Sequence, residues 1–422
     1  MMRIREAATF CVLGALAVPA SAQSDLDAKL KRLNDAAQAD PALSPDFKAA
    51  LSDVAGSLGK AQGGGLGAWV DKLKFYGDFR LRHESDFELD DQESRNRERL
   101  RLRVGGDYAV NDQMSVGARL VTGTASDENS PHQNLGGTFD KFSISLDRAF
   151  VTWKPAALAG AWLTGGKFSH PIERNPVYGE LVWDEDVQPT GVAAGGTHGA
   201  FKWMAGEYIL LDNSTNGTLE SAWAFVAQGS ASTKLGETDK LTGALAFYRY
   251  SRLNPDDVNG SRFFGENNGN VGVDTTGDAT LDDYLSRFTI WNPMVVLENT
   301  SFSQPLILST EWIFNSRAKI SADSGYSLGV KWGKNKAKGD WQAYYNWQAM
   351  GQDAVLSNFT NDDFLFGTNY RGHLVGVKWQ CLDKAELHLW GSAMRRGSLG
   401  TSATTDDDQL QMRARVDLNI RF

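Results

Sequence analysis

Residues 95–108 read RNRERLRLRVGGDY, and their side chains alternate in polarity. Leu100, Leu102 and Val104 share one parity, and the arginines share the other: Arg95, Arg97, Arg99, Arg101 and Arg103. Because successive side chains of a strand point to opposite faces, this pattern predicts a strand with one apolar and one basic face. In a soluble sheet the apolar face would be the core, whereas in a transmembrane barrel it would meet lipid and the arginines would line water. The strand alone fits both.

Similar alternation continues along the chain to its last residue. In 73–83, Phe75, Phe79 and Leu81 lie on one parity, and Arg80 and Arg82 lie on the other. We predict about 16 strands from this period of two. Their ranges are 73–83, 95–110, 113–124, 141–154, 158–169, 187–197, 200–211, 221–232, 239–251, 285–298, 304–316, 324–334, 339–351, 370–382, 384–397 and 408–422.

The lengths of the connections decide between the two environments. Short connections at 111–112, 197–199, 335–338 and 382–383 are interspersed with long polar ones. The long connections are 84–94, 125–140, 170–186, 212–220, 252–284, 317–323, 352–369 and 398–407. Short turns at one end and long loops at the other are typical of a transmembrane barrel, with the long loops outside the cell. We therefore predict an all-β, antiparallel transmembrane barrel whose first strand pairs with its last.

Aromatic residues support the membrane setting. Tryptophans near predicted strand ends are expected to form girdles at the two interfaces: Trp153, Trp162, Trp203, Trp332, Trp341 and Trp379. The final segment alternates from Met412 to a terminal Phe422. A terminal aromatic residue after alternating apolar residues resembles the signal that the barrel-assembly machinery reads, so we assign this role to Phe422.

The N-terminal part predicts export. Residues 1–22 have a basic start, a short apolar run and an Ala20-Ser21-Ala22 end, which is the pattern of a cleaved signal peptide. Residues 23–70 read as a helical and flexible periplasmic leader, and 71–422 form the barrel. Cys381 is then the single cysteine of the mature chain, which excludes an internal disulfide. Export and a net charge of −9 argue against nucleic acid as a partner.

Four segments resemble the putative-porin family of Gram-negative outer membranes. They are RNRERLRLRVGGDYAVNDQMSVGARLVTG (95–123), LDRAFVTWKP (146–155), LTGGKF (163–168) and LVWDEDVQPTGVAAG (181–195). The resemblance implies a porin in the cell outer membrane, in contact with lipid and lipopolysaccharide. It also implies small polar solutes as cargo and a possible homo-oligomer. We expect no cofactor, no metal and no enzymatic activity.

Resemblance to general porins implies that the third long loop, 170–186, bends inward and narrows the channel. Its charged residues are Glu173, Arg174, Glu180, Asp184, Glu185 and Asp186. The facing wall would be basic, formed by Arg80, Arg82, Arg97, Arg99, Arg101 and Arg103, with Arg119 and Lys167 nearby. These arginines either neutralise lumenal carboxylates or bias the passage of solutes, since basic pores favour anions. Replacing Arg99 and Arg101 by glutamate would shift ion preference toward cations if they set selectivity.

Alternative functions remain open from the sequence. A solute-selective porin for an anion such as phosphate, or for a sugar, would use the same wall or the polar set Gln342, Tyr344, Asn346 and Gln348. A barrel enzyme could use Glu386 and His388, and a structural barrel would have a plugged lumen. The Asp-rich segment 274–283 does not have the spacing of a calcium loop. We therefore interpret that segment as a solvated loop.

Overall fold

The structure is a computed structural model of the whole chain. It describes residues 72–87, 94–212, 221–253, 267–275, 277–397 and 409–422, with isolated residues 35, 48, 49 and 70. The chain divides into two compact units, Met1–Lys74 and Phe75–Phe422. The predicted signal peptide and helical leader, 1–70, lie outside the described residues apart from those isolated positions. The second unit contains the predicted barrel.

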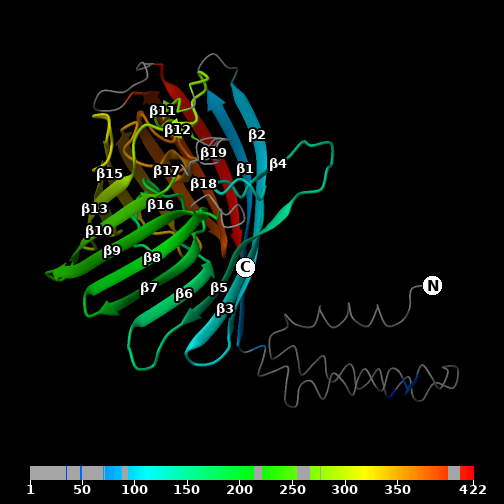
Figure 1. Ribbon diagram of the computed structural model, residues 1–422. Coiled ribbons are helices and arrows are strands. Elements are labelled where there is room, and N and C mark those ends of the chain that lie inside the picture. The colour runs from blue at the N-terminus through cyan, green and yellow to red at the C-terminus, as the bar shows by residue number, and fades with distance from the viewer. Residues whose placement is uncertain are drawn as a thin grey trace. The chain divides into compact units, whose positions relative to one another are not determined.

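Antiparallel strands form the wall of this unit (Figure 1). The strands of the wall are β1 (Leu73–Phe87), β2 (Arg95–Ala109), β3 (Met114–Thr122), β5 (Ile144–Trp153), β6 (Ala161–Lys167), β7 (Thr190–His198), β8 (Phe201–Leu211), β9 (Ala222–Leu235), β10 (Asp239–Ser251), β13 (Thr289–Asn299), β14 (Leu306–Asn315), β15 (Ser324–Gly333), β16 (Trp341–Met350), β17 (Tyr370–Leu382), β18 (Ala385–Arg396) and β19 (Gln411–Arg421). The two-residue β4 (Gln133–Asn134) adds to β2 beside β3, so the sheet of 17 strands has 16 in the wall of the described chain.

Besides β4, three short elements lie in the described parts of the loops. They are β11 (Gly272–Val273) and β12 (Asp283–Tyr284), which pair with each other, and the 3-10 turn η3 (Ser357–Phe359). No helix in the described part of the chain is long and apolar enough to cross a membrane.

The barrel closes between its first and last strands, as predicted. β1 pairs with β19 in a continuous register that includes Phe79 with Ile420 and Arg82 with Asp417. Beyond the last paired residue, Gly77 and Phe422 exchange two backbone hydrogen bonds of 3.0 and 3.1 Å. Closure leaves no strand edge with unpaired N–H and C=O groups, which a bilayer would penalise. Each of the 16 predicted strand ranges overlaps one strand of the wall, so the predicted architecture is confirmed.

The two parities of each strand face different environments. On β19, the even-numbered Val416 and Ile420 are 42% and 38% exposed, whereas Arg415 and Asp417 are each 1% exposed. The apolar side chains therefore cover the outer surface and the charged ones point inside. This is the reverse of a soluble protein, and it suits a wall surrounded by lipid.

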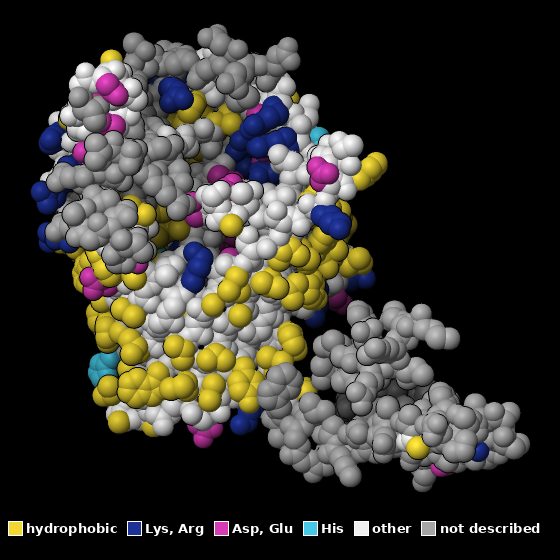
Figure 2. Space-filling view, turned by 45° about the vertical axis from the view of Figure 1, so that its right-hand side comes forward, with side chains coloured by type: hydrophobic (Ala, Val, Ile, Leu, Met, Phe, Trp, Pro, Cys, Tyr) yellow, Lys and Arg dark blue, Asp and Glu magenta, His cyan; other side chains and the backbone are white. Residues whose placement is uncertain are grey.

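Tryptophans on the outer surface lie near the ends of strands. Five of the six predicted girdle residues are exposed to similar extents: Trp153, Trp203, Trp332, Trp341 and Trp379. Figure 2 shows hydrophobic side chains gathered in a band around the lower part of the barrel. The prediction for Trp162 is wrong, because the next residue, Leu163, takes the outward parity and Trp162 packs against the interior cluster.

Short and long connections lie at opposite ends of the barrel, as predicted. The shortest turns, such as 199–200 between β7 and β8 and 383–384 between β17 and β18, lie at one end. The long connections 168–189 and 351–369 start from the other end. These two, which we call the inner loops, fold into the barrel rather than away from it.

The inner loops pack against each other and against one side of the wall. The rings of Trp183 and Phe359 stack at 5.2 Å with an interplanar angle of 13°, and the Asp184 N–H donates to the Phe359 carbonyl at 2.7 Å. Trp183 also contacts Tyr208 of β8 and Tyr248 of β10, both of which are fully buried. An aromatic cluster therefore fills this side of the interior. A cavity lies against β18, β19, β1 and β2.

Candidate functional site: a charged passage inside the barrel

Three neighbouring strands place a set of arginines on the interior surface. Over segments 78–86, 95–103 and 413–417 the inward parity carries nine arginines and four carboxylates, an excess of five guanidinium groups. We call this surface the arginine wall. Its arginines are Arg80, Arg82, Arg95, Arg97, Arg99, Arg101, Arg103, Arg413 and Arg415, and its carboxylates are Asp78, Glu84, Asp86 and Asp417. Figure 2 shows Lys and Arg side chains inside the rim near the top of the barrel.

Carboxylates of the wall hold most of its arginines in fixed positions. Asp417 accepts two hydrogen bonds from Arg82, at 2.7 and 3.0 Å, across the joint between β19 and β1. Glu84 is fully buried and binds both Arg97 and Arg415. A buried carboxylate needs such partners, since an unpaired buried charge costs several kcal/mol. These pairs link the three strands β19, β1 and β2 through their side chains.

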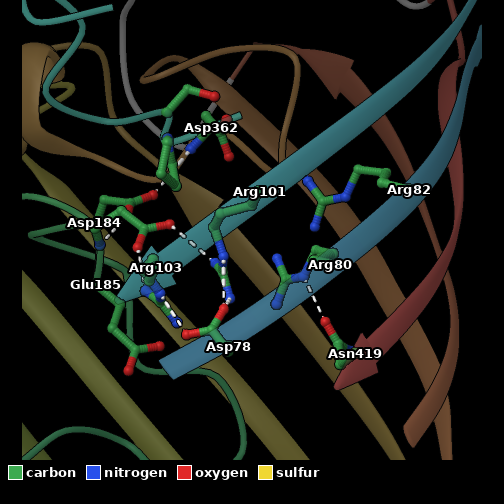
Figure 3. Close-up of polar contacts among 12 residues, drawn as sticks. Asp78, Arg80, Arg82, Arg101, Arg103, Asp184, Glu185, Asp362 and Asn419 are labelled. Atoms are coloured by element: carbon green, nitrogen blue, oxygen red, sulfur yellow. Dashed lines mark hydrogen bonds and ion pairs between the residues drawn. The ribbon is translucent and has the colours of Figure 1, made fainter. Parts of the chain in front are cut away.

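The loop 168–189 brings a carboxylate against this wall, as the sequence predicts. Asp186 lies 2.9 Å from Arg103 and 3.6 Å from Arg101. The same two arginines also bind Asp78 of β1, each at 2.7 Å (Figure 3). The two carboxylates and two guanidinium groups thus form one network that links the loop to the wall.

The second inner loop also carries acidic residues to the wall, and the sequence analysis missed it. Asp363 binds Arg415, and the backbone carbonyl of Asp362 accepts a 2.6 Å hydrogen bond from Arg413. The segment 352–369 was predicted as a long external loop. Its apolar content was the available signal, because Val355, Leu356, Phe359, Phe364 and Phe366 would not suit a solvated loop.

A cavity of about 520 Å³ separates the arginine wall from the inner loops. Six loop carboxylates line it, together with wall residues such as Arg80, Arg82, Arg101 and Arg103. The loop carboxylates are Glu180, Asp184, Glu185, Asp186, Asp362 and Asp363. Positive charge in excess on one side therefore faces negative charge on the other. Figure 3 shows the side chains of Arg80 and Arg82 projecting from β1 into this space.

The pKa values of two loop carboxylates, Asp184 and Asp186, are shifted in opposite directions. Burial raises the pKa of Asp184 well above its ordinary value, and the neighbouring carboxylates Glu180, Asp186 and Asp362 raise it further. Burial also opposes ionisation of Asp186, but the guanidinium groups of Arg101 and Arg103 outweigh it and lower the pKa of Asp186. At neutral pH Asp186 is thus the firmly ionised member of the pair.

Some predicted site residues lie elsewhere. Glu173 binds Lys202 at 3.0 Å in a separate cavity, and Arg174 donates to the carbonyls of Gly179 and Trp183 within its own loop. The expectation that this pair faces the arginine wall is therefore wrong. The loop descends past β8 and β9 before it reaches the wall, so its first residues meet other partners.

Two further predicted wall residues are also bound away from the cavity. Arg119 forms an ion pair with Asp147, and the Lys167 ammonium donates to the Gln188 carbonyl at 2.9 Å. Arg97 and Arg99 belong to the wall but do not line the cavity. They are held by Glu84, which lies 3.7 Å from Arg99.

Within the part of the chain that the structure describes, the remaining sequence features form no second site of comparable extent. In the segment 274–283, Asp274 accepts backbone hydrogen bonds from Gly277 and Ala279, which shape the turn. No group of three or more potential metal ligands is present among the described residues. His388 hydrogen-bonds the Tyr344 hydroxyl at 2.9 Å, whereas Glu386 binds Asn419 and Arg421.

A closed antiparallel barrel with an apolar outer surface and a charged interior defines a transmembrane β-barrel of the outer-membrane class. A family model described as "Putative porin" matches residues 87–280 and 279–422. The chain belongs to this family of porins and is an outer-membrane porin.

Solved structures agree with this fold. OprB of Pseudomonas putida, in its high-pH structure, aligns with a TM-score of 0.53 and 11% sequence identity, over 86% of this chain and 97% of OprB. OmpT of Vibrio cholerae, in a trimer form, aligns with a TM-score of 0.50 and 16% identity, over 83% of this chain and 99% of OmpT. At such identities the likeness concerns the fold alone. A search of curated proteins gives no match.

Proposed function

We propose that small polar solutes and ions diffuse passively through the cavity between the arginine wall and the inner loops. The observation that carries this proposal is the network in which Asp186 of a loop meets Arg101 and Arg103 of the wall. It narrows the interior at a place where charges of both signs line the remaining space. A solute crossing here exchanges bulk water for charged side chains, so its charge affects its rate of passage.

The roles of the site residues follow from this geometry. Arg80, Arg82, Arg101 and Arg103 form the basic side, and the loop carboxylates form the acidic side. Their opposition sets up a field across the passage, which is stronger than in bulk water because the interior excludes much of the solvent. The alternative is a solute-selective channel, in which one class of solute binds at the wall.

The remaining parts of the proposal concern assembly and surroundings. We assign residues 1–22 to a cleaved signal peptide and 23–70 to a periplasmic leader, and Phe422 to recognition by the barrel-assembly machinery. The apolar outer surface suits outer-membrane lipid and lipopolysaccharide. One structural relative is described in a trimer form, which supports a homo-oligomer for this chain as well.

Reconstitution into a planar bilayer under a salt gradient tests the proposal. We expect discrete single-channel current steps, and a zero-current potential that reports the ion preference. A purified, folded barrel that gives no steps at any voltage would contradict passive diffusion and favour a plugged structural barrel. A lipid- or peptide-cleaving activity that is lost in His388→Ala would favour the enzyme alternative.

A further inference from the structure

One polar side chain at the cavity has no hydrogen-bond partner. His132 is 8% exposed and lines the cavity, and neither of its ring nitrogens has a hydrogen-bond partner in the described part of the chain. A buried polar group without a partner costs free energy, so native structures pair such groups with protein, water or ligand. The site therefore has two open hydrogen-bonding positions.

The imidazole is held in place by its own segment. The loop 123–143 turns inward at Ser130, whose hydroxyl accepts a 2.8 Å hydrogen bond from Arg99 of the wall. The Pro131 carbonyl accepts a 2.9 Å hydrogen bond from the Thr122 hydroxyl, and β4 then pairs with Arg99 and Leu100. His132 is thus fixed from both sides, as a residue of a preformed binding site would be.

Arg80 supplies a cation that is only partly neutralised. Its Nε donates to the Asn419 side-chain oxygen at 2.6 Å, while its two terminal nitrogens have no hydrogen-bond partner among the described residues. The carboxylate within 4 Å of it, Asp417, lies at 3.8 Å and is already bound to Arg82 at 2.7 Å. Arg80 lines the same cavity as His132. Two free guanidinium nitrogens are well arranged for an oxyanion.

We propose that Arg80 and His132 form a binding subsite for a small oxyanion that carries both acceptor oxygens and a hydroxyl group, as hydrogen phosphate does. The subsite rests on the proposed porin function, and it names a class of solute that the passage would favour. The acceptor oxygens bind the terminal nitrogens of Arg80. The hydroxyl donates to the imidazole nitrogen that carries no hydrogen, while the ring N–H points in a different direction and bonds water.

The surroundings of His132 support a neutral ring. Burial lowers its pKa well below the ordinary value, and the positive charges of Arg82, Arg80, Arg101 and Arg99 lower it further. A neutral imidazole has one donor and one acceptor. The hydroxyl of hydrogen phosphate can donate to the acceptor nitrogen, whereas sulfate and acetate have no hydroxyl to donate. Phosphate should therefore bind more tightly than sulfate or acetate.

Block of the open channel tests this subsite. In the reconstituted full-length protein, inorganic phosphate replaces chloride at constant ionic strength and neutral pH, and single-channel current is recorded. We expect phosphate to reduce the chloride-carried current in a saturable way, with a lower half-blocking concentration than sulfate or acetate. Equal effects of the three anions would overturn the role of the imidazole.

Variants locate the block. Arg80→Gln should raise the half-blocking phosphate concentration about tenfold or more, and His132→Phe, which keeps an aromatic ring, should raise it severalfold. Lys240→Gln removes the same charge from a lysine that is paired with Glu298 outside the cavity, so it should leave the block unchanged. Unchanged block in both Arg80→Gln and His132→Phe would overturn the proposal.

Two measurements distinguish a misfolded variant from a wrong subsite and from a wrong passage. Heat-modifiable migration on a gel shows whether each variant is folded, and Arg80→Lys replaces Arg80→Gln if the latter is not. The lysine variant should still weaken phosphate block, because an ammonium group lacks the paired guanidinium nitrogens. Current steps without phosphate block would overturn the subsite alone, whereas no current steps at all would overturn the proposed passage as well.

Discussion

At the scale of single residues, the contact between Asp186 and the arginine wall gives the sharpest prediction for ion preference. Asp186→Asn removes a firmly ionised carboxylate and leaves Arg101 and Arg103 less neutralised. We expect the zero-current potential in a potassium chloride gradient to shift toward anion preference.

Glu173→Gln is the matched control for this experiment. It removes the same charge from the same loop, but Glu173 binds Lys202 in a separate cavity. An equal shift in both variants would show that overall loop charge, rather than the contact at the wall, governs ion preference.

Glu84 is a second residue whose replacement has a large predicted effect. It is fully buried and binds Arg97 and Arg415, so Glu84→Gln leaves two guanidinium groups without their shared counter-charge. Breaking a buried ion pair typically costs about 3–5 kcal/mol. The measurement is the free energy of unfolding of the detergent-refolded barrel in urea.

The exposed pair of His83 and Glu98, with their ring nitrogen and carboxylate oxygen 2.6 Å apart, provides the comparison. Glu98→Gln should cost no more than about 1 kcal/mol, because exposed pairs contribute little. Similar losses of unfolding free energy in the two variants would mean that the ion pairs of Glu84 stabilise the barrel no more than an exposed pair does.

At the scale of elements, the two inner loops depend on each other through the stacked rings of Trp183 and Phe359. Trp183→Ala removes a buried aromatic ring at a typical cost of about 3–5 kcal/mol, enough to loosen the docking of the loops. We expect larger single-channel conductance and faster swelling of liposomes in large sugars. Trp379→Ala, on the outer surface, should change neither. Unchanged conductance in Trp183→Ala would mean that the loops are held by other contacts.

The docking of these loops should also depend on pH. Burial and the carboxylates Glu180, Asp186 and Asp362 raise the pKa of Asp184, so the docked state favours the protonated form. This contribution is complete below the ordinary pKa of about 3.9 and is lost as pH rises through the raised value. Conductance should therefore rise with pH over that window, and Asp184→Asn should flatten the rise. A wild-type conductance that is constant over the whole pH range in which the barrel stays folded would contradict this expectation.

At the scale of the whole molecule, the strands of the barrel wall were predictable from the sequence. Alternate residues of each strand face lipid and the interior, and this imposes an alternating pattern along the strand. The inner loops were only partly predictable. The inward course of the loop 170–186 was expected from a resemblance, but its residue Glu173 binds Lys202 rather than the arginine wall. The inward folding of the loop 351–369 was not predicted, because its burial depends on packing against the aromatic cluster inside the barrel. A period of two cannot report such long-range packing.

The terminal residue gives a prediction at the same scale. Phe422 makes its two hydrogen bonds to Gly77 through the backbone, so Phe422→Ala keeps them. If the ring serves recognition by the assembly machinery, the variant should be depleted from the outer membrane of cells. It should nevertheless refold in detergent with nearly normal stability. Normal abundance in cells would contradict the assigned role.

The joint between β1 and β19 has a consequence for biogenesis. Three hydrogen-bonded ion pairs cross it in the described part of the chain, Arg82 with Asp417, Glu84 with Arg415 and Asp86 with Arg413, and they join residues more than 300 positions apart. The arginine wall is therefore incomplete until the final strand has been synthesised and inserted. A nascent barrel that is still open at this joint lacks part of the arginine wall, so it cannot select between solutes. Maturation of the pore and closure of the barrel are a single event.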